Sequence, residues 1–123
     1  MTDSKHTLPP HSVSIHQIKS GIVIDFQGDL DLVSAPVLDR RFEEALGDLK
    51  SMSEDQTLFL DLRKLDFIDS AGLALLIHMS KELTAISRTF TVLVTEKGQP
   101  DRILRIGHFY KILDLAYEFK DVE

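Results

Sequence analysis

The chain has 123 residues, with 20 acidic and 14 basic side chains and a formal net charge of −6. This length fits one compact domain, and the acidic balance disfavours a nucleic-acid partner. The sequence contains no cysteine, which excludes disulfides, thiol catalysis and cysteine-ligated metals. It also contains no apolar run of the roughly 20 residues that a membrane span requires, and its polar start shows no secretory signal.

Residues 1–12 form the expected flexible tail, because Pro9 and Pro10 discourage regular structure, and residues 13–123 form the expected domain. Residues 13–18 alternate apolar and polar side chains, as a half-buried strand does, and residues 22–27 are rich in β-branched side chains. The short turn between them predicts a hairpin. Residues 28–31 have turn chemistry and are expected to close the second strand.

A helix is predicted from Ser34, a suitable N-cap, with Pro36 in its first turn. Its apolar side chains recur at steps of three and four and form one stripe: Ala35, Leu38, Phe42, Ala45, Leu46 and Leu49. The remaining predicted elements are a central strand at 57–62, a helix at about 70–86, a strand at 90–95, a short helix at 102–109 and a strand at 115–119. This order predicts a small α/β domain with a mixed sheet, an opening hairpin followed by βαβ units.

The helix predicted at 70–86 is apolar almost all round in its first two turns. Leu73, Leu76, Ile77 and Leu83 are expected to face the sheet, whereas Ala74, Leu75 and Met79 are expected to point away. Two interpretations are open for the second face. Either a loop or the last helix covers it, or part of it is exposed for a partner, a surface that Met79 would suit.

Ser70 begins this helix, and three roles are open to it. Asp69 or Ser70 could simply cap the helix. A nucleophilic serine needs a base within hydrogen-bond reach, and His78 lies more than two turns further along the helix. A phosphate on Ser70 would be favoured by the helix N-terminus and opposed by Asp69, Asp29 and Asp31.

No cofactor or metal site is predicted. His6, His11 and His16 are spaced by five residues, which matches no usual set of metal ligands. The sequence also has no glycine-rich nucleotide motif.

Four motifs follow one another between residues 13 and 119. They are Gly28-Asp29-Leu30-Asp31, Ser34-Ala35-Pro36, Leu60-Asp61-Leu62 and Asp66-Phe67-Ile68-Asp69-Ser70-Ala71-Gly72-Leu73. In this order they resemble the STAS domain, and within it the bacterial anti-sigma factor antagonists (anti-anti-sigma factors). The resemblance implies a single STAS-type domain with a small mixed sheet and helices packed on one side.

The resemblance also implies a partner-switching role in cytoplasmic signal transduction and transcription regulation. The serine that falls on Ser70 is phosphorylated in such antagonists by an anti-sigma factor, which is a serine kinase with a histidine-kinase-type ATPase fold. The unphosphorylated antagonist binds that factor and releases its target. Phosphorylation ends the binding, and a PP2C-type phosphatase with a divalent metal reverses it.

The expected partner-binding residues follow from this resemblance together with the apolar second helix. Asp69 falls beside the acceptor, Asp31 falls on a loop acid near the partner, and Gly72 allows close packing. Many relatives carry a second hydroxyl residue where Ala71 stands, and glutamate is common where Asp29 stands. The complete predicted set is Asp29, Asp31, Asp69, Ala71, Gly72, Leu75 and Met79.

Three other functions compete with this interpretation. The run from Ala71 to Leu76 with His78 also resembles STAS subunits of lipid-transport ABC complexes, which are binding modules that generally lack the acceptor serine. A response-regulator receiver would need paired acids after its first strand, and these are absent. An enzyme would need a catalytic constellation that the sequence does not contain. A non-enzymatic, cytoplasmic switch protein is therefore the prediction.

Overall fold

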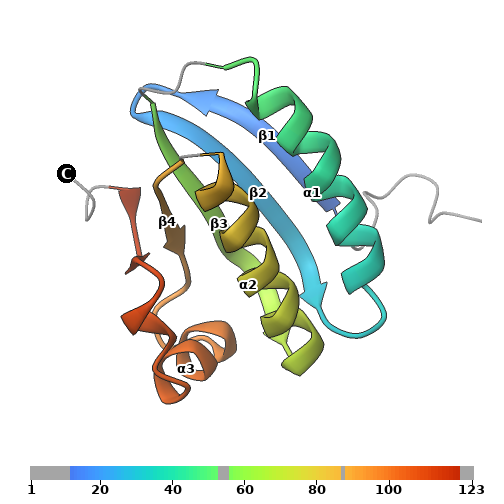
Figure 1. Ribbon diagram of the computed structural model, residues 1–123. Helices are drawn as coiled ribbons and strands as arrows, with labels where there is room; N and C mark the ends of the chain where they lie inside the picture. Colours follow the sequence, from blue (N-terminus) through green and yellow to red (C-terminus); the bar gives the residue numbers. More distant parts are fainter. Residues whose placement is uncertain (1–11, 53–55, 87, 120–123) are drawn as a thin grey trace, which may run out of the picture.

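The computed structural model describes residues 12–52, 56–86 and 88–119, so nearly all of the predicted tail at 1–12 lies outside the described residues. Its elements are β1 (Ser12–Ile18), β2 (Gly21–Leu30), α1 (Ala35–Leu49), β3 (Thr57–Ile68), α2 (Ser70–Ala85), β4 (Phe90–Leu93), α3 (Gln99–Ile106), a 3-10 turn (Phe109–Lys111) and β5 (Leu115–Ala116). The strands form one sheet in the order β1-β2-β3-β4-β5 (Figure 1). Only the hairpin pair β1–β2 is antiparallel among these neighbours, so the predicted mixed α/β sheet is confirmed.

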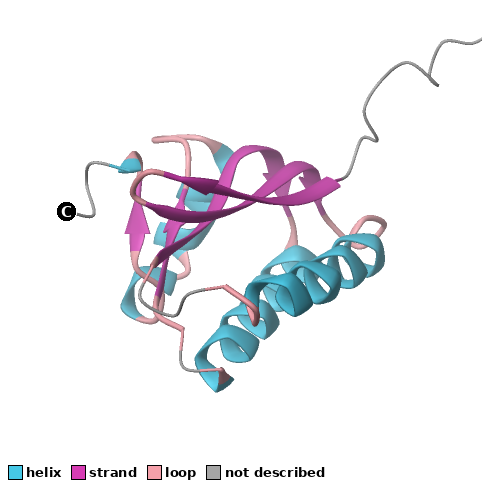
Figure 2. Cartoon of the chain, turned by 90° about the horizontal axis from the view of Figure 1, so that it is seen from above, coloured by secondary structure: helices cyan, strands magenta, loops and turns pink. Residues whose placement is uncertain are grey.

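Helices α1 and α2 lie side by side against one face of the sheet (Figure 2). The predicted stripe of α1 is confirmed, because Leu38, Phe42 and Leu49 are fully buried, and Ala45 and Leu46 nearly so. Leu104 of α3 joins the same apolar core. The implied packing of helices on one side of the sheet is therefore observed.

The predicted orientation of α2 is right for Leu76 and Leu83, which are fully buried, and for Ala74, which is exposed. It is wrong for Leu75 and Met79, which are 7% exposed and fully buried in the core, whereas Leu73 and Ile77 are only half-buried. The helix is apolar on several sides because it packs on the sheet and also contacts α1. Leu75 and Met79 therefore hold the fold together and do not present a surface to a partner.

Strands β2 and β3 are longer than predicted. The turn expected at residues 28–31 is instead strand up to Leu30, and β3 continues through Ile68. Two register shifts in the β2–β3 pairing absorb the irregular stretch, and Gly28 adopts a positive φ of 105° that favours glycine. Both strands consequently reach the edge at which α1 and α2 begin (Figure 1).

The second face of the sheet has a small apolar cluster of its own, centred on Val23, Phe59 and Leu93. Phe119 packs edge-on against Phe59 with ring centroids 4.9 Å apart, and the Arg63 guanidinium lies 4.9 Å from the centre of the Phe119 ring. The strand predicted at 115–119 ends at Ala116, because β4 offers only four residues and pairs with β5 at two. Phe119, beyond β5, covers this face instead.

We expect Phe119→Ala to lower the free energy of unfolding by about 1–3 kcal/mol, since it removes a half-buried ring and its contacts with Phe59 and Arg63. Urea unfolding followed by circular dichroism measures the change. The exposed Ile112→Ala serves as control and should shift stability by no more than about 0.5 kcal/mol. Equal effects of the two substitutions would contradict the covering role of Phe119.

Candidate functional site

Ser70 is the first residue of α2, and its side chain is exposed. The cap of the helix is Asp69, whose carboxylate Oδ1 accepts a hydrogen bond from the Gly72 amide at 2.9 Å. Of the two cap candidates in the sequence, Asp69 therefore has the structural role. The Ser70 hydroxyl is left at the surface for other chemistry.

Asp69 also connects the start of α2 to the end of β2. Its second carboxylate oxygen, Oδ2, accepts a hydrogen bond from the Leu32 amide at 3.2 Å. Its own amide donates to the Leu30 carbonyl, also at 3.2 Å. One short side chain thus fixes the helix start and the loop after β2 relative to each other.

Gly72 lies directly against the end of β2. A Cβ atom placed on it would be 2.0 Å from the Leu30 carbonyl oxygen, closer than any real contact. Because the obstructing atom belongs to the backbone of a central strand, it cannot move aside cheaply. The close packing expected of Gly72 is therefore present.

The loop from Asp31 to Ser34 is shaped by its own polar side chains. The Asp31 carboxylate accepts hydrogen bonds from the amides of Val33 and Ser34, at 3.0 and 2.9 Å. Ser34 is buried and occupies the N-cap position of α1 as predicted, but its hydroxyl makes no capping hydrogen bond to the helix. It donates to the Asp29 carbonyl at 2.5 Å and accepts from the Asp31 amide at 3.0 Å.

A contribution that the sequence did not reveal comes from Gln99, the first residue of α3. Its side-chain amide pairs with both backbone groups of Ile68, accepting from the amide and donating to the carbonyl, each at 2.8 Å. The amide side chain acts as one more strand partner for the end of β3. The backbone immediately before Ser70 is therefore held from both sides.

Three exposed apolar residues flank this site and were also missed from the sequence. Leu32 and Val33 are 73% and 80% exposed in the loop after β2, and Phe67 is 43% exposed near the end of β3. Leu32 bonds through its amide to Asp69, so the loop borders the start of α2. We call Leu32, Val33, Phe67 and Ser70 the switch surface. The sequence signal for this surface was the apolar pair Leu32 and Val33, which lies between the predicted turn at 28–31 and the helix predicted from Ser34.

The switch surface lies among carboxylates. Asp29 and Phe67 are register partners in the β2–β3 pairing, Asp31 belongs to the loop, and Asp66 and Asp69 are in the same segment as Ser70. Five of the seven predicted partner-binding residues therefore lie with Ser70 at the ends of two parallel strands: Asp29, Asp31, Asp69, Ala71 and Gly72. Leu75 and Met79 lie behind them in the core.

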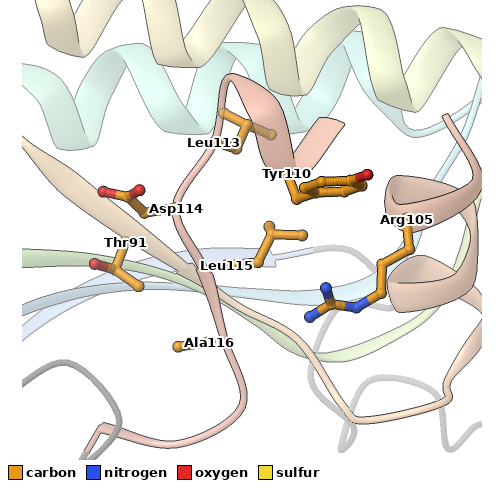
Figure 3. Close-up of a pocket in the computed structure, with 7 residues that line it drawn as sticks. All are labelled: Thr91, Arg105, Tyr110, Leu113, Asp114, Leu115 and Ala116. Atoms are coloured by element: carbon orange, nitrogen blue, oxygen red, sulfur yellow. The ribbon is translucent and has the colours of Figure 1, made fainter. Parts of the chain in front are cut away.

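A separate hollow of about 420 Å³ opens beside β5 and is lined by residues of β4, α3 and the segment after it (Figure 3). Its Arg105 is held by Asp101, with a guanidinium–carboxylate distance of 2.8 Å, and lies over the Tyr117 ring. Burial and the charge of Asp101 raise the pKa of Tyr117. Its lining residues include none of those around Ser70.

The family model of the STAS domain matches residues 12–122. The chain belongs to the STAS domain family. Its fold is similar to an anti-sigma factor antagonist from Mycobacterium paratuberculosis, with a TM-score of 0.72, 21% identity and coverage of 90% of this chain and 89% of that chain. The fold is also similar to a putative anti-sigma factor antagonist from Thermotoga maritima, with a TM-score of 0.71 and 15% identity. The match covers 89% of this chain and 90% of that chain.

The Bacillus antagonist SpoIIAA is a further structural neighbour of this STAS domain. Its phosphorylated form matches with a TM-score of 0.56 and 17% identity, covering 90% of this chain and 96% of that chain. At these identities the likeness establishes the fold. It agrees with the fold that the sequence resemblance implied.

We expect Gly72→Ala to destabilise the STAS domain by at least about 2 kcal/mol, because the new methyl group would overlap the Leu30 carbonyl. The matched control is Gly47→Ala in α1, where nothing lies within 4 Å of the added Cβ. This control should stabilise the fold by about 0.5–1 kcal/mol, since alanine is the better helix former. Thermal unfolding of both variants checks the pair, and a Gly72→Ala protein as stable as the control would refute the close packing.

Proposed function

We propose that this STAS domain protein is an anti-sigma factor antagonist in a cytoplasmic partner-switching pathway, controlled by phosphorylation of Ser70. The observation that carries the proposal is the placement of Ser70. It is exposed at a helix start that another residue caps, beside the exposed apolar side chains of Leu32 and Val33. An acceptor serine has to be reachable by a kinase, and a binding surface has to offer apolar area for burial.

The start of α2 can accommodate a phosphate. Its 16 residues align their peptide dipoles toward Ser70, and amides of the first turn that have no partner within the helix point the same way. A phosphate there would add about 1.5 to 2 negative charges and three acceptor oxygens. Asp69 already occupies the Gly72 amide, so the phosphate can be added without removing the existing cap.

The same phosphate would oppose partner binding. A partner that covers Leu32, Val33 and Phe67 must also approach the carboxylates of Asp31 and Asp69. Two further charges at the centre of that contact would have to be stripped of water or matched by new cations. The modification therefore ends binding through charge and bulk, while the fold below it stays intact.

The partners in this proposal are an anti-sigma factor that is a serine kinase with a histidine-kinase-type ATPase fold, and a PP2C-type phosphatase. The antagonist itself is a binding protein without catalytic activity. Its contact residues are Asp29, Asp31, Asp69 and Ala71 together with the switch surface, and Gly72 contributes by positioning the helix. One observation supports the assignment: SpoIIAA, a structural neighbour, has structures in unphosphorylated and phosphorylated forms. In the described parts of this chain, no helix is long and apolar enough to cross a membrane.

We expect Ser70→Asp to weaken binding to the kinase partner by at least about 30-fold, because a charge enters the contact. Ser70→Ala should bind as tightly as the wild type, since the hydroxyl serves phosphorylation and not affinity. The control is Ser20→Asp, an equally added charge at the exposed hairpin turn before β2. It should leave binding unchanged.

The measurement begins with a lysate of the source organism, using the three variants and the wild type as baits and mass spectrometry to identify bound proteins. The captured kinase is then purified, its affinity for each variant is measured, and its phosphorylation product is mapped. An acid-stable phosphate on Ser70 is the expected product, since an aspartyl phosphate is acid-labile. Capture of the same transporter subunits by the wild type and by Ser70→Asp would overturn the switch and favour the lipid-transport interpretation.

A further inference from the structure

Four metal-ligating side chains meet on the outer side of the α1–α2 pair. Asp39 and Glu43 are four residues apart on α1, and His78 and Glu82 are four residues apart on α2, so each pair lies on one face of its helix. The His78 Nε2 atom is 3.2 Å from a Glu82 carboxylate oxygen and 3.9 Å from oxygens of both Asp39 and Glu43. Packing of the two helices therefore brings two pairs of side chains, each with ordinary helical spacing, into one cluster.

We propose that Asp39, Glu43, His78 and Glu82 form a site for a divalent transition-metal ion of the zinc class, bridging α1 and α2. Ligand atoms of Asp39, Glu43 and His78 all lie within 4.8 Å of one another. In a tetrahedral zinc site with bonds of about 2.1 Å, neighbouring ligand atoms are about 3.4 Å apart. Rotations of these partly exposed side chains would close that difference without moving the helices.

The choice of metal follows from the donor atoms. Magnesium and calcium prefer sites built wholly from oxygen, whereas an imidazole nitrogen with carboxylates suits zinc and its first-row neighbours. Three carboxylates around one imidazole also leave an excess of negative charge at the site. Two positive charges from the ion would offset this excess.

The Oδ1 atom of Asp39 also belongs to this cluster. The Asp39 side chain as a whole is 42% exposed, but this oxygen is shielded from solvent, makes no hydrogen bond within the described residues and lies 3.9 Å from His78 Nε2. A shielded carboxylate oxygen without a partner is costly, and a metal bond would satisfy it.

Binding would have a structural consequence at a distance from the site. Helix α1 follows the loop that contains Leu32 and Val33, and α2 begins at Ser70, so a metal bridge joins the two helices that support the switch surface. The absence of a metal site in the sequence-based prediction has a simple cause. No single segment contains more than two of the four ligands, and only helix packing joins them.

The test uses tag-free protein in which His6, His11 and His16 are replaced by glutamine, because these other histidines could bind zinc on their own. Calorimetric titration with zinc chloride, after treatment with a chelator, should show one ion per chain. His78→Gln and Glu43→Gln should each lower the affinity by at least about 10- to 100-fold, the loss typical of even an indirect supporting residue. Saturating zinc should raise the melting temperature of the background protein and not that of His78→Gln.

The matched control is His108→Asn, a histidine outside the cluster whose positive φ of 60° asparagine tolerates. It should leave zinc affinity unchanged. Circular dichroism should show both ligand variants folded, since the side chains they alter are about half exposed. Absence of one-to-one zinc binding, or equal binding by the background protein and both ligand variants, would overturn the site. Neither result would bear on the Ser70 switch, which is tested with the partner kinase.

Discussion

The contact between the end of β2 and the start of α2 is the constraint on which this site depends. The Leu30 carbonyl accepts the Asp69 amide, and the helix comes so close that residue 72 can have no side chain. Asp69 then uses one carboxylate oxygen for its own helix and the other for the loop after β2. A strand, a loop and a helix are thereby fixed around one exposed hydroxyl.

The hydrogen bonds that build the site are made by polar residues other than Ser70. Asp31 and Ser34 satisfy the backbone of their own loop, Gln99 satisfies the end of β3, and Asp69 caps the helix. A change at Ser70 therefore alters charge at the surface without breaking the hydrogen bonds that build the site. This arrangement suits a reversible modification, because both states can share one fold.

The parallel pair of α1 and α2 connects the two proposed sites. Its beginning supports the switch surface, and its outer side holds His78 among three carboxylates. The helices meet through a shared core in which Phe42, Leu76 and Met79 are fully buried. Stiffening this pair would act on the geometry of the loop and of Ser70 without any contact to the partner.

The amino-acid sequence determined the order of elements, the mixed sheet, the buried stripe of α1 and the position of Ser70 at a helix start. These are consequences of periodicity, turn chemistry and capping, which act over a few residues. Tertiary structure decided which face of α2 is buried, because an almost wholly apolar helix gives no periodic signal. The helix packs against both the sheet and α1, so side chains on more than one face are buried. It also decided how far β2 and β3 extend, since their pairing absorbs irregular residues through register shifts. The roles of Gln99, Leu32 and the His78 cluster depend on atoms more than 30 residues apart in the chain, and only packing brings such atoms within bonding distance.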